Sequence, residues 1–243
     1  MKTMAIFKRE LKAYFESPVA YVFLVVFLVL TGFLTFSVTQ FFERGSADLQ
    51  PFFFWHPWVY LLLVPAGTMA LWAEERRAGT IELLLTMPVT MTQAILGKFF
   101  AAWLFITIAL ALTFPIVLTT MYLGSPDLGV VAAGYLGSVL LGGAYVAVGM
   151  LTSSMTRSTV ISFVLALVVC LVFLLAGWAP VTGFFDQWAP NWLVEAIAGL
   201  SFMPHFESIQ RGVIDLRDII YFISIMGFMI AATHVVLDNR KSA

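Results

Sequence analysis

Six long apolar segments constrain this chain more than any other feature of its sequence. Each is about 20 residues long, the length that a helix needs to cross the hydrocarbon core of a bilayer. Apolar residues make up 61% of the chain and charged residues only 11%, against about 45–50% and about 25% in soluble proteins. The sequence therefore predicts an all-α, polytopic membrane protein with one transmembrane domain, residues 1–243. Its six predicted spans are Val19–Thr39, Phe53–Ala73, Phe99–Leu123, Tyr135–Leu151, Thr159–Ala179 and Ile219–Leu237.

Helix-breaking residues lie inside several of these spans. Pro65 and Pro115 cannot donate a backbone hydrogen bond, and the Gly142–Gly143 pair favours no single conformation. Neighbouring helices in a bundle can tolerate such breaks. We therefore expect interrupted helices at these three positions.

The basic residues are distributed unequally between the two sets of connecting segments. Three lie on one side, at Arg44, Arg211 and Arg217, and ten on the other. Basic residues favour the cytoplasmic side of a membrane, so both termini are predicted to be cytoplasmic. The net charge of −1 indicates no global basic surface for nucleic acid. The ten residues are Lys2, Lys8, Arg9, Lys12, Arg76, Arg77, Lys98, Arg157, Arg240 and Lys241.

Residues 1–17 are predicted to form an amphipathic helix in the inner interface of the bilayer. Met4, Phe7, Leu11 and Tyr14 fall on one stripe of this helix, and charged residues cover most of the remainder. The Ser17–Pro18 pair is expected to end it. Such a helix either anchors the chain to the membrane or acts as a mechanical element beside a cytoplasmic partner.

Residues 74–88, EERRAGTIELLLTMP, connect the second and third predicted spans. Gly79 can end the preceding helix, and Thr80 can cap a short helix that Pro88 stops. Thr90 and Gln93 form a capping box that begins the next helix. The short helix, rich in leucine, is expected to lie on the cytoplasmic face, where its apolar side chains must cover lipid headgroups or another protein.

Residues 180–217 form the large external segment. Their tryptophan and phenylalanine residues are typical of the headgroup region, and we expect a re-entrant hairpin before the last span. Glu195 lies in an apolar part of this segment, where it is either a functional acid or simply faces water.

Several classes of chemistry lack their sequence motifs. The chain has no G-x-x-x-x-G-K-[ST] phosphate loop and no G-x-S-x-G elbow. Glu74-Glu75 does not extend to the E-E-x-x-x-R pattern of intramembrane proteases, because position 79 is Gly79. Ionisable residues are nearly absent from the spans, which disfavours an ion-coupled transporter. We therefore expect no enzyme, and no catalytic, cofactor-binding or metal-binding residue in this chain.

The segment from Glu75 to Pro88 resembles the E-x-x-x-G-T-x-E-x-L-L-x-x-P motif of ABC-2-type permeases. Its position between spans two and three agrees with that family, as do the interfacial helix and the external hairpin. His205-Phe206-Glu207-Ser208, followed by Arg211, is similar to a segment of the gliding-motility type of permease. His205, Glu207 and Arg211 therefore join Glu195 as candidates in the external hairpin.

The resemblance implies a permease of the bacterial inner membrane that is driven by two separate ATPase subunits, which bind ATP and Mg²⁺. It implies a second permease copy, identical or a close paralogue, and in the gliding type a membrane-anchored protein with a large external domain. Thr80–Thr86 would be the coupling helix seated in an ATPase groove. The implied coupling residues are Glu74, Glu75, Arg76, Arg77, Gly79, Thr80, Ile81, Glu82, Leu84 and Leu85.

The expected function is export or transmission of force across the membrane. One alternative is a membrane scaffold or signalling subunit that anchors a periplasmic machine without transport, and another is a channel that needs no ATP. For the predicted dimer, aromatic and small residues of spans one and five are plausible contacts, such as Phe27, Gly32 and Phe173.

Overall fold

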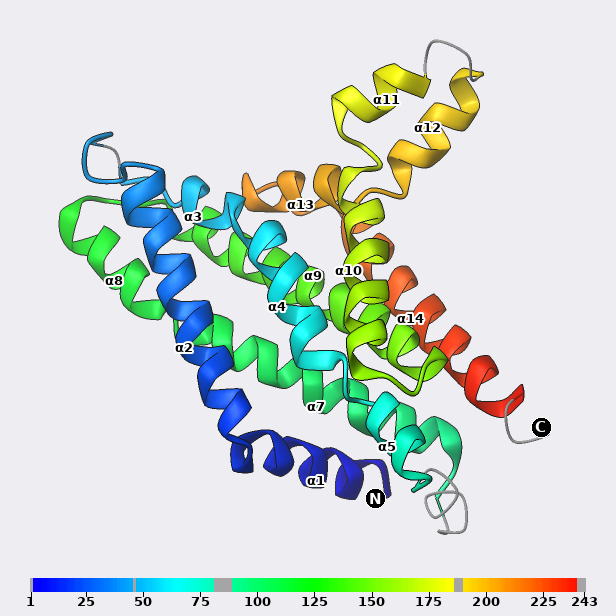
Figure 1. The fold of residues 1–243 in the computed structure, drawn as a ribbon. Helices are drawn as coiled ribbons and strands as arrows, with labels where there is room; N and C mark the ends of the chain where they lie inside the picture. Colours follow the sequence, from blue (N-terminus) through cyan, green and yellow to red (C-terminus); the bar gives the residue numbers. More distant parts are fainter. Residues whose placement is uncertain (1, 46, 81–88, 186–189, 240–243) are drawn as a thin grey trace.

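A computed structural model describes residues 2–45, 47–80, 89–185 and 190–239. These residues form helices and no strands. Both termini lie at one end of the helical bundle, and α11 and α12 project from the other end (Figure 1). The elements are α1 (Lys2–Glu16), α2 (Pro18–Phe33), the π-helical turn η1 (Leu34–Val38), α3 (Gln50–Phe54), α4 (His56–Thr68), α5 (Ala73–Ala78), α7 (Met91–Ala111), α8 (Phe114–Leu123), α9 (Leu128–Met155), α10 (Thr159–Leu175), α11 (Ala179–Phe185), α12 (Asn191–Gly199), α13 (Phe202–Gln210) and α14 (Leu216–Asn239).

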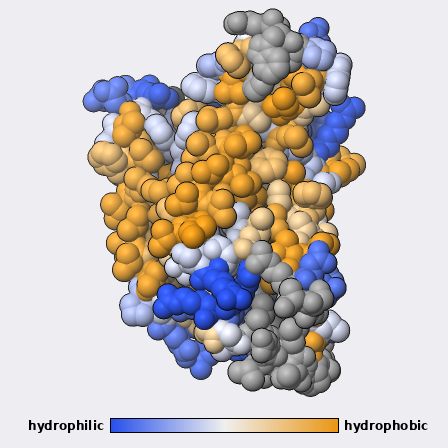
Figure 2. All heavy atoms as spheres, turned by 45° about the vertical axis from the view of Figure 1, so that its right-hand side comes forward, coloured by the Kyte–Doolittle hydropathy of each residue, from blue (hydrophilic) through white to orange (hydrophobic). Residues whose placement is uncertain are grey.

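Within the described residues, four helical segments are long and apolar enough to cross a bilayer. They are Pro18–Val38, Met91–Leu123, Leu128–Met155 and Leu216–Asn239. The predicted fifth span corresponds to α10, which has 17 residues, and the predicted second span is divided among α3, α4 and α5. The chain is thus a multi-pass membrane protein, whereas the count of six spans stays a prediction. Figure 2 shows the apolar surface that such a protein presents to lipid, with hydrophilic residues gathered toward the two ends.

The helix boundaries predicted at Ser17 and at Thr90 are confirmed. Helix α1 ends at Glu16, and the hydroxyl oxygen of Ser17 accepts a hydrogen bond from Val19 N at the start of α2. Thr90 and Gln93 form the reciprocal capping box at the start of α7. Local side-chain chemistry therefore decides where these helices begin and end.

Of the three predicted interruptions, only the one at Pro115 is confirmed, where α7 gives way to α8. Helix α4 continues through Pro65, and α9 continues through Gly142 and Gly143. The prediction at the glycines was wrong because they serve packing. A Cβ atom at Gly143 would lie 2.9 Å from the Trp103 ring, so the bare backbone makes room for that ring.

Helix α9 forms the centre of the bundle and packs against α4, α7, α10, α13 and α14. At its far end, α13 covers the bundle with the buried side chains of Phe202, Phe206 and Ile209. The predicted external hairpin is represented by α11 and α12, which extend beyond α10 rather than back between the spans (Figure 1). Its re-entrant character is therefore not confirmed.

Close packing between α9 and α4 generates a first prediction. A Cβ atom at Gly149 would overlap Thr68 Oγ1 and approach Thr68 Cβ to 2.9 Å. Thr68 is buried and donates its hydroxyl to Val64 O, so it cannot turn away freely. We expect Gly149→Ala to destabilise the protein by about 1–3 kcal/mol, measured as a lower thermal unfolding temperature in detergent.

Gly227→Ala is the matched control, because a Cβ atom there meets nothing within 4 Å. This variant should unfold at or slightly above the wild-type temperature, since alanine favours helix more than glycine does. Equal unfolding temperatures for the two variants would contradict the packing argument.

Candidate coupling site

Helix α5 carries the first of the predicted coupling residues. Its acidic first turn contains Glu74 and Glu75, and its last turn contains Arg76 and Arg77, an order that complements the helix dipole. Gly79 ends the helix with φ +70°, a left-handed conformation that glycine adopts without strain, as the sequence predicts. The predicted coupling residues Ile81, Glu82, Leu84 and Leu85 lie outside the described residues.

The turn that precedes α5 is held by the end of α9. The buried hydroxyl oxygen of Ser153 accepts hydrogen bonds from Trp72 N, at 2.9 Å, and Ala73 N, at 3.0 Å. The same hydroxyl donates to Met69 O at 2.9 Å. The guanidinium of Arg76 also donates to the backbone carbonyl of Ser154. One helix end thus fixes both the turn and α5.

Lys98 of α7 lies in a buried charged cluster that joins three helices. Its Nζ is 3.1 Å from Glu10 Oε2 of α1 and 2.9 Å from Glu75 Oε1 of α5. It also lies over the Trp72 ring, 5.2 Å from the centroid. A charge that is only 3% exposed is costly unless it is paired. We call Glu10, Trp72, Glu75 and Lys98 the Lys98 cluster.

Glu10 stays ionised in this setting. Burial acts to raise its pKa, but the charges and hydrogen bonds of Lys98 and Arg9 outweigh burial and hold that pKa below the usual value of 4.5. Arg9 Nη2 lies 2.6 Å from Glu10 Oε1. The two carboxylates of the cluster therefore face two cations.

Helix α1 is fixed to the bundle at two further points. A Cβ atom at Gly97 would come within 2.8 Å of the Ile6 side chain, so glycine lets α1 approach α7 closely. Tyr14 stacks on Phe105 with centroids 4.8 Å apart and donates its hydroxyl to Gly67 O at 3.1 Å. Burial raises the pKa of Tyr14, which keeps its hydroxyl protonated as a donor. This packing holds α1 against α4 and α7 of the same chain.

The predicted coupling residues on α5 and directly after it fall into two groups. Glu75 and Arg76 are partly buried and contact α7 and α9, whereas Glu74, Arg77, Gly79 and Thr80 are exposed. Exposed side chains at this end remain accessible to a partner.

The predicted external residues lie at the opposite end and do not form one site. Glu207 on α13 pairs at 3.0 Å with Arg211, which directly follows that helix, and Glu195 is exposed on α12. His205 Nδ1 is 2.6 Å from Asp218 Oδ1, and its ring stacks on Tyr221 with centroids 3.9 Å apart. Across the described ranges, no group of three or more His, Cys, Asp or Glu residues could hold a metal ion.

Sequence reasoning missed the Lys98 cluster. In the sequence, Lys98 is one of several basic residues that flank the predicted spans, and no motif marks Glu10 on its helix. The available signal was a lysine directly before an apolar run, at a depth where an unpaired ammonium is unfavourable. No local pattern identifies the partners of Lys98, because Glu10 lies 88 positions away in the sequence and Glu75 lies 23 positions away.

The Lys98 cluster generates a second prediction. Lys98→Met keeps the side-chain length but leaves the Glu10 and Glu75 carboxylates without their shared cation. We expect a loss of stability on the order of 3 kcal/mol, measured by thermal unfolding at neutral pH. Lys12→Met is the matched control, since the Lys12–Glu16 pair is exposed, and it should change stability little.

Acid should act on the same cluster. The lowered pKa of Glu10 means that the unfolded chain binds more protons than the folded protein, so stability falls as pH falls below about 4.5. Glu10→Gln should weaken this acid sensitivity. An unchanged acid profile in Glu10→Gln, together with a stable Lys98→Met, would contradict the role of the cluster.

One protein family matches the part of the chain that contains most of this site. Residues 59–189, more than half of the chain, match the family described as ABC-2 family transporter protein. This region begins in α4 and extends beyond α11, so it includes α5, Lys98 and the central helix α9. A comparison with curated proteins finds no match. The match agrees with the motif at Glu75–Pro88, and the chain belongs to the ABC-2 transporter family.

Proposed function

We propose that this chain is the permease subunit of an ABC transporter, driven by separate ATPase subunits that dock at residues 74–88. The Lys98 cluster is the observation that carries the proposal. It ties α5, which leads into the predicted coupling helix, to α1 and α7 through ion pairs of 3.1 and 2.9 Å. Family membership supports the permease role, and the exposed side chains of Glu74 and Arg77 suit a docking rim.

The packing supports a mechanical form of coupling. Ser153 holds the turn before α5, Arg76 holds α5 to the end of α9, and Lys98 holds α5 to α7. A push on the segment after Thr80 would therefore displace α1, α5, α7 and α9 together rather than α5 alone. We propose that closure of two ATPases on ATP and Mg²⁺ supplies this push, and that the result is export or force directed outward.

A second permease copy completes the proposed assembly. Phe27 is excluded as a contact, because it is 1% exposed and packs against Tyr60 inside this chain. Phe173 is also engaged within the chain, where it stacks on Phe202. Gly32 remains open, and the exposed apolar face of α2 beside it is a suitable surface for the other copy. The projecting hairpin of α11 and α12 is the proposed contact for an external, membrane-anchored partner.

Substitutions in the coupling segment provide the third prediction. Burial of a leucine contributes about 1.5–3 kcal/mol, and a charge in its place adds a desolvation cost. Leu84→Asp should therefore reduce the amount of P-loop ATPase that co-purifies with the tagged chain at least tenfold. Glu82→Ala should leave membrane insertion intact and reduce coupled ATP hydrolysis.

Val213→Asp is the control, because Val213 is an exposed apolar residue at the other end of the bundle. It should keep wild-type ATPase association. If Leu84→Asp inserts normally and still retains the ATPase at the wild-type level, residues 80–86 do not form the docking helix.

The fourth prediction concerns orientation. Both termini lie at the end of the bundle that carries α5, and the α8–α9 connection lies at the other (Figure 1). With the basic residues concentrated at the first end, we expect this end to be cytoplasmic. A cytoplasm-active reporter fused after Ala243 should be active, as should a periplasm-active reporter inserted near Asp127. Periplasmic activity at the C-terminus would reverse the proposed topology.

A further inference from the structure

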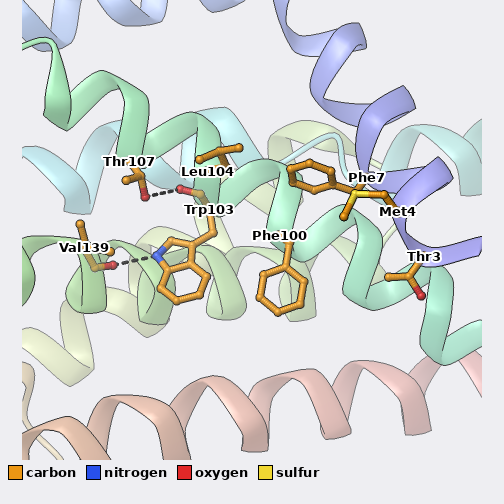
Figure 3. A pocket seen from close by; sticks show the side chains of 8 residues that line it. All are labelled: Thr3, Met4, Phe7, Phe100, Trp103, Leu104, Thr107 and Val139. Atoms are coloured by element: carbon orange, nitrogen blue, oxygen red, sulfur yellow. Dashed lines mark hydrogen bonds between the residues drawn. The ribbon is translucent and has the colours of Figure 1, made fainter. Parts of the chain in front are cut away.

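A groove of about 640 Å³ opens where α1 crosses α7 (Figure 3). Its volume lies within the range of roughly 300–1,000 Å³ that is typical of small-molecule sites. Three helices supply the walls: Thr3, Met4 and Phe7 from α1, Phe100, Trp103, Leu104 and Thr107 from α7, and Val139 from α9.

The chemistry of the walls selects an apolar occupant. Most of the lining side chains are apolar, and the polar groups of α7 in the lining are already engaged. Trp103 Nε1 donates to Val139 O at 2.8 Å, and Thr107 Oγ1 donates to Trp103 O at 2.8 Å (Figure 3). Ordered water needs two to four polar partners, so these walls favour hydrocarbon over water.

The size of the groove excludes a long helical partner. A helix about 10–12 Å across fills roughly 400–600 Å³ per turn, so this volume accommodates little more than one turn. A flexible acyl chain, in contrast, can follow the cleft between α1 and α7. Met4, Phe100 and Leu104 are 56%, 44% and 36% exposed, which leaves the groove open to the surrounding bilayer.

Helix α1, which lines the groove, also carries an exposed cation. Lys8 directly follows the lining residue Phe7 and is exposed. Arg9 pairs with Glu10, and Lys12 pairs with Glu16. Among the cations of α1 whose side chains the structure describes, Lys8 is the one without an ion-pair partner. Because α1 lies across the end of the bundle (Figure 1), Lys8 is placed for a headgroup at the interface.

We propose that this groove binds one acyl chain of an anionic membrane phospholipid, with the headgroup phosphate beside Lys8. The bound chain fills the space between α1 and α7 and contacts Trp103 and Phe7. It thereby adds an apolar contact to the junction that the Lys98 cluster holds by charge. This site is independent of any ATPase and goes beyond the proposed permease role.

Lipid retention tests the proposal. The full-length chain, from membranes of phosphatidylethanolamine and phosphatidylglycerol, is released into mild detergent and its bound lipids are counted by native mass spectrometry. Leu104→Trp fills the groove and should retain one lipid fewer than the wild type. Leu165→Trp is the matched control on α10, because Leu165 is 38% exposed and lies outside the groove, and it should retain the wild-type number.

Charge selectivity is tested separately, with variants that leave the groove unfilled. Lys8→Ala should lower the preference for phosphatidylglycerol over phosphatidylethanolamine about fivefold, while Lys12→Ala should not. If Leu104→Trp and Leu165→Trp both fold, equal lipid counts in these two variants would overturn the site. If Leu104→Trp unfolds, the lysine variants decide, and equal lipid selectivity in Lys8→Ala and Lys12→Ala would overturn it. Disulfide-linked dimers of Leu104→Cys would also overturn it, because a second copy would then occupy the groove.

Discussion

The buried ammonium of Lys98 is the constraint on which the arrangement of this end of the protein depends. It is 3% exposed, and two carboxylates from two other helices lie within 3.1 Å of its Nζ. If both carboxylates moved away, the buried ammonium would be left unpaired, which is strongly unfavourable. The position of α5 is therefore set by α1 and α7 as well as by the end of α9.

Small residues of α9 and α7 make this geometry possible. Gly149 lets Thr68 pack closely, Gly143 makes room for Trp103, and Gly97 lets α1 approach α7. In a bilayer, close packing of this kind holds helices together where a hydrophobic driving force between them is absent. The charged cluster and the Gly97 contact thus both join α1 to α7, one by electrostatics and the other by close contact.

The two ends of the bundle differ in how they are built. At the end with the termini, ion pairs and the Ser153 hydroxyl connect α1, α5, α7 and α9. At the other end, α13 is held by buried aromatic side chains and by the contact of His205 with Asp218, while α11 and α12 project freely (Figure 1). The connected end suits the transmission of a displacement, and the projecting end suits contact with a partner outside the bundle.

The sequence by itself determined the membrane class, the helix before Ser17, the helix start at Thr90 and the end at Gly79, because hydropathy and capping act over short distances along the chain. It also contained the family motif. Only the tertiary structure decided that Gly142 and Gly143 lie in an unbroken helix and that Lys98 joins Glu10 to Glu75. Glycine permits both a break and a close approach, and an ion pair between distant residues depends on how the helices pack. Helix continuity at the glycines and the partners of Lys98 are therefore decided by the packing of the bundle, since no local pattern specifies which buried charge meets which partner.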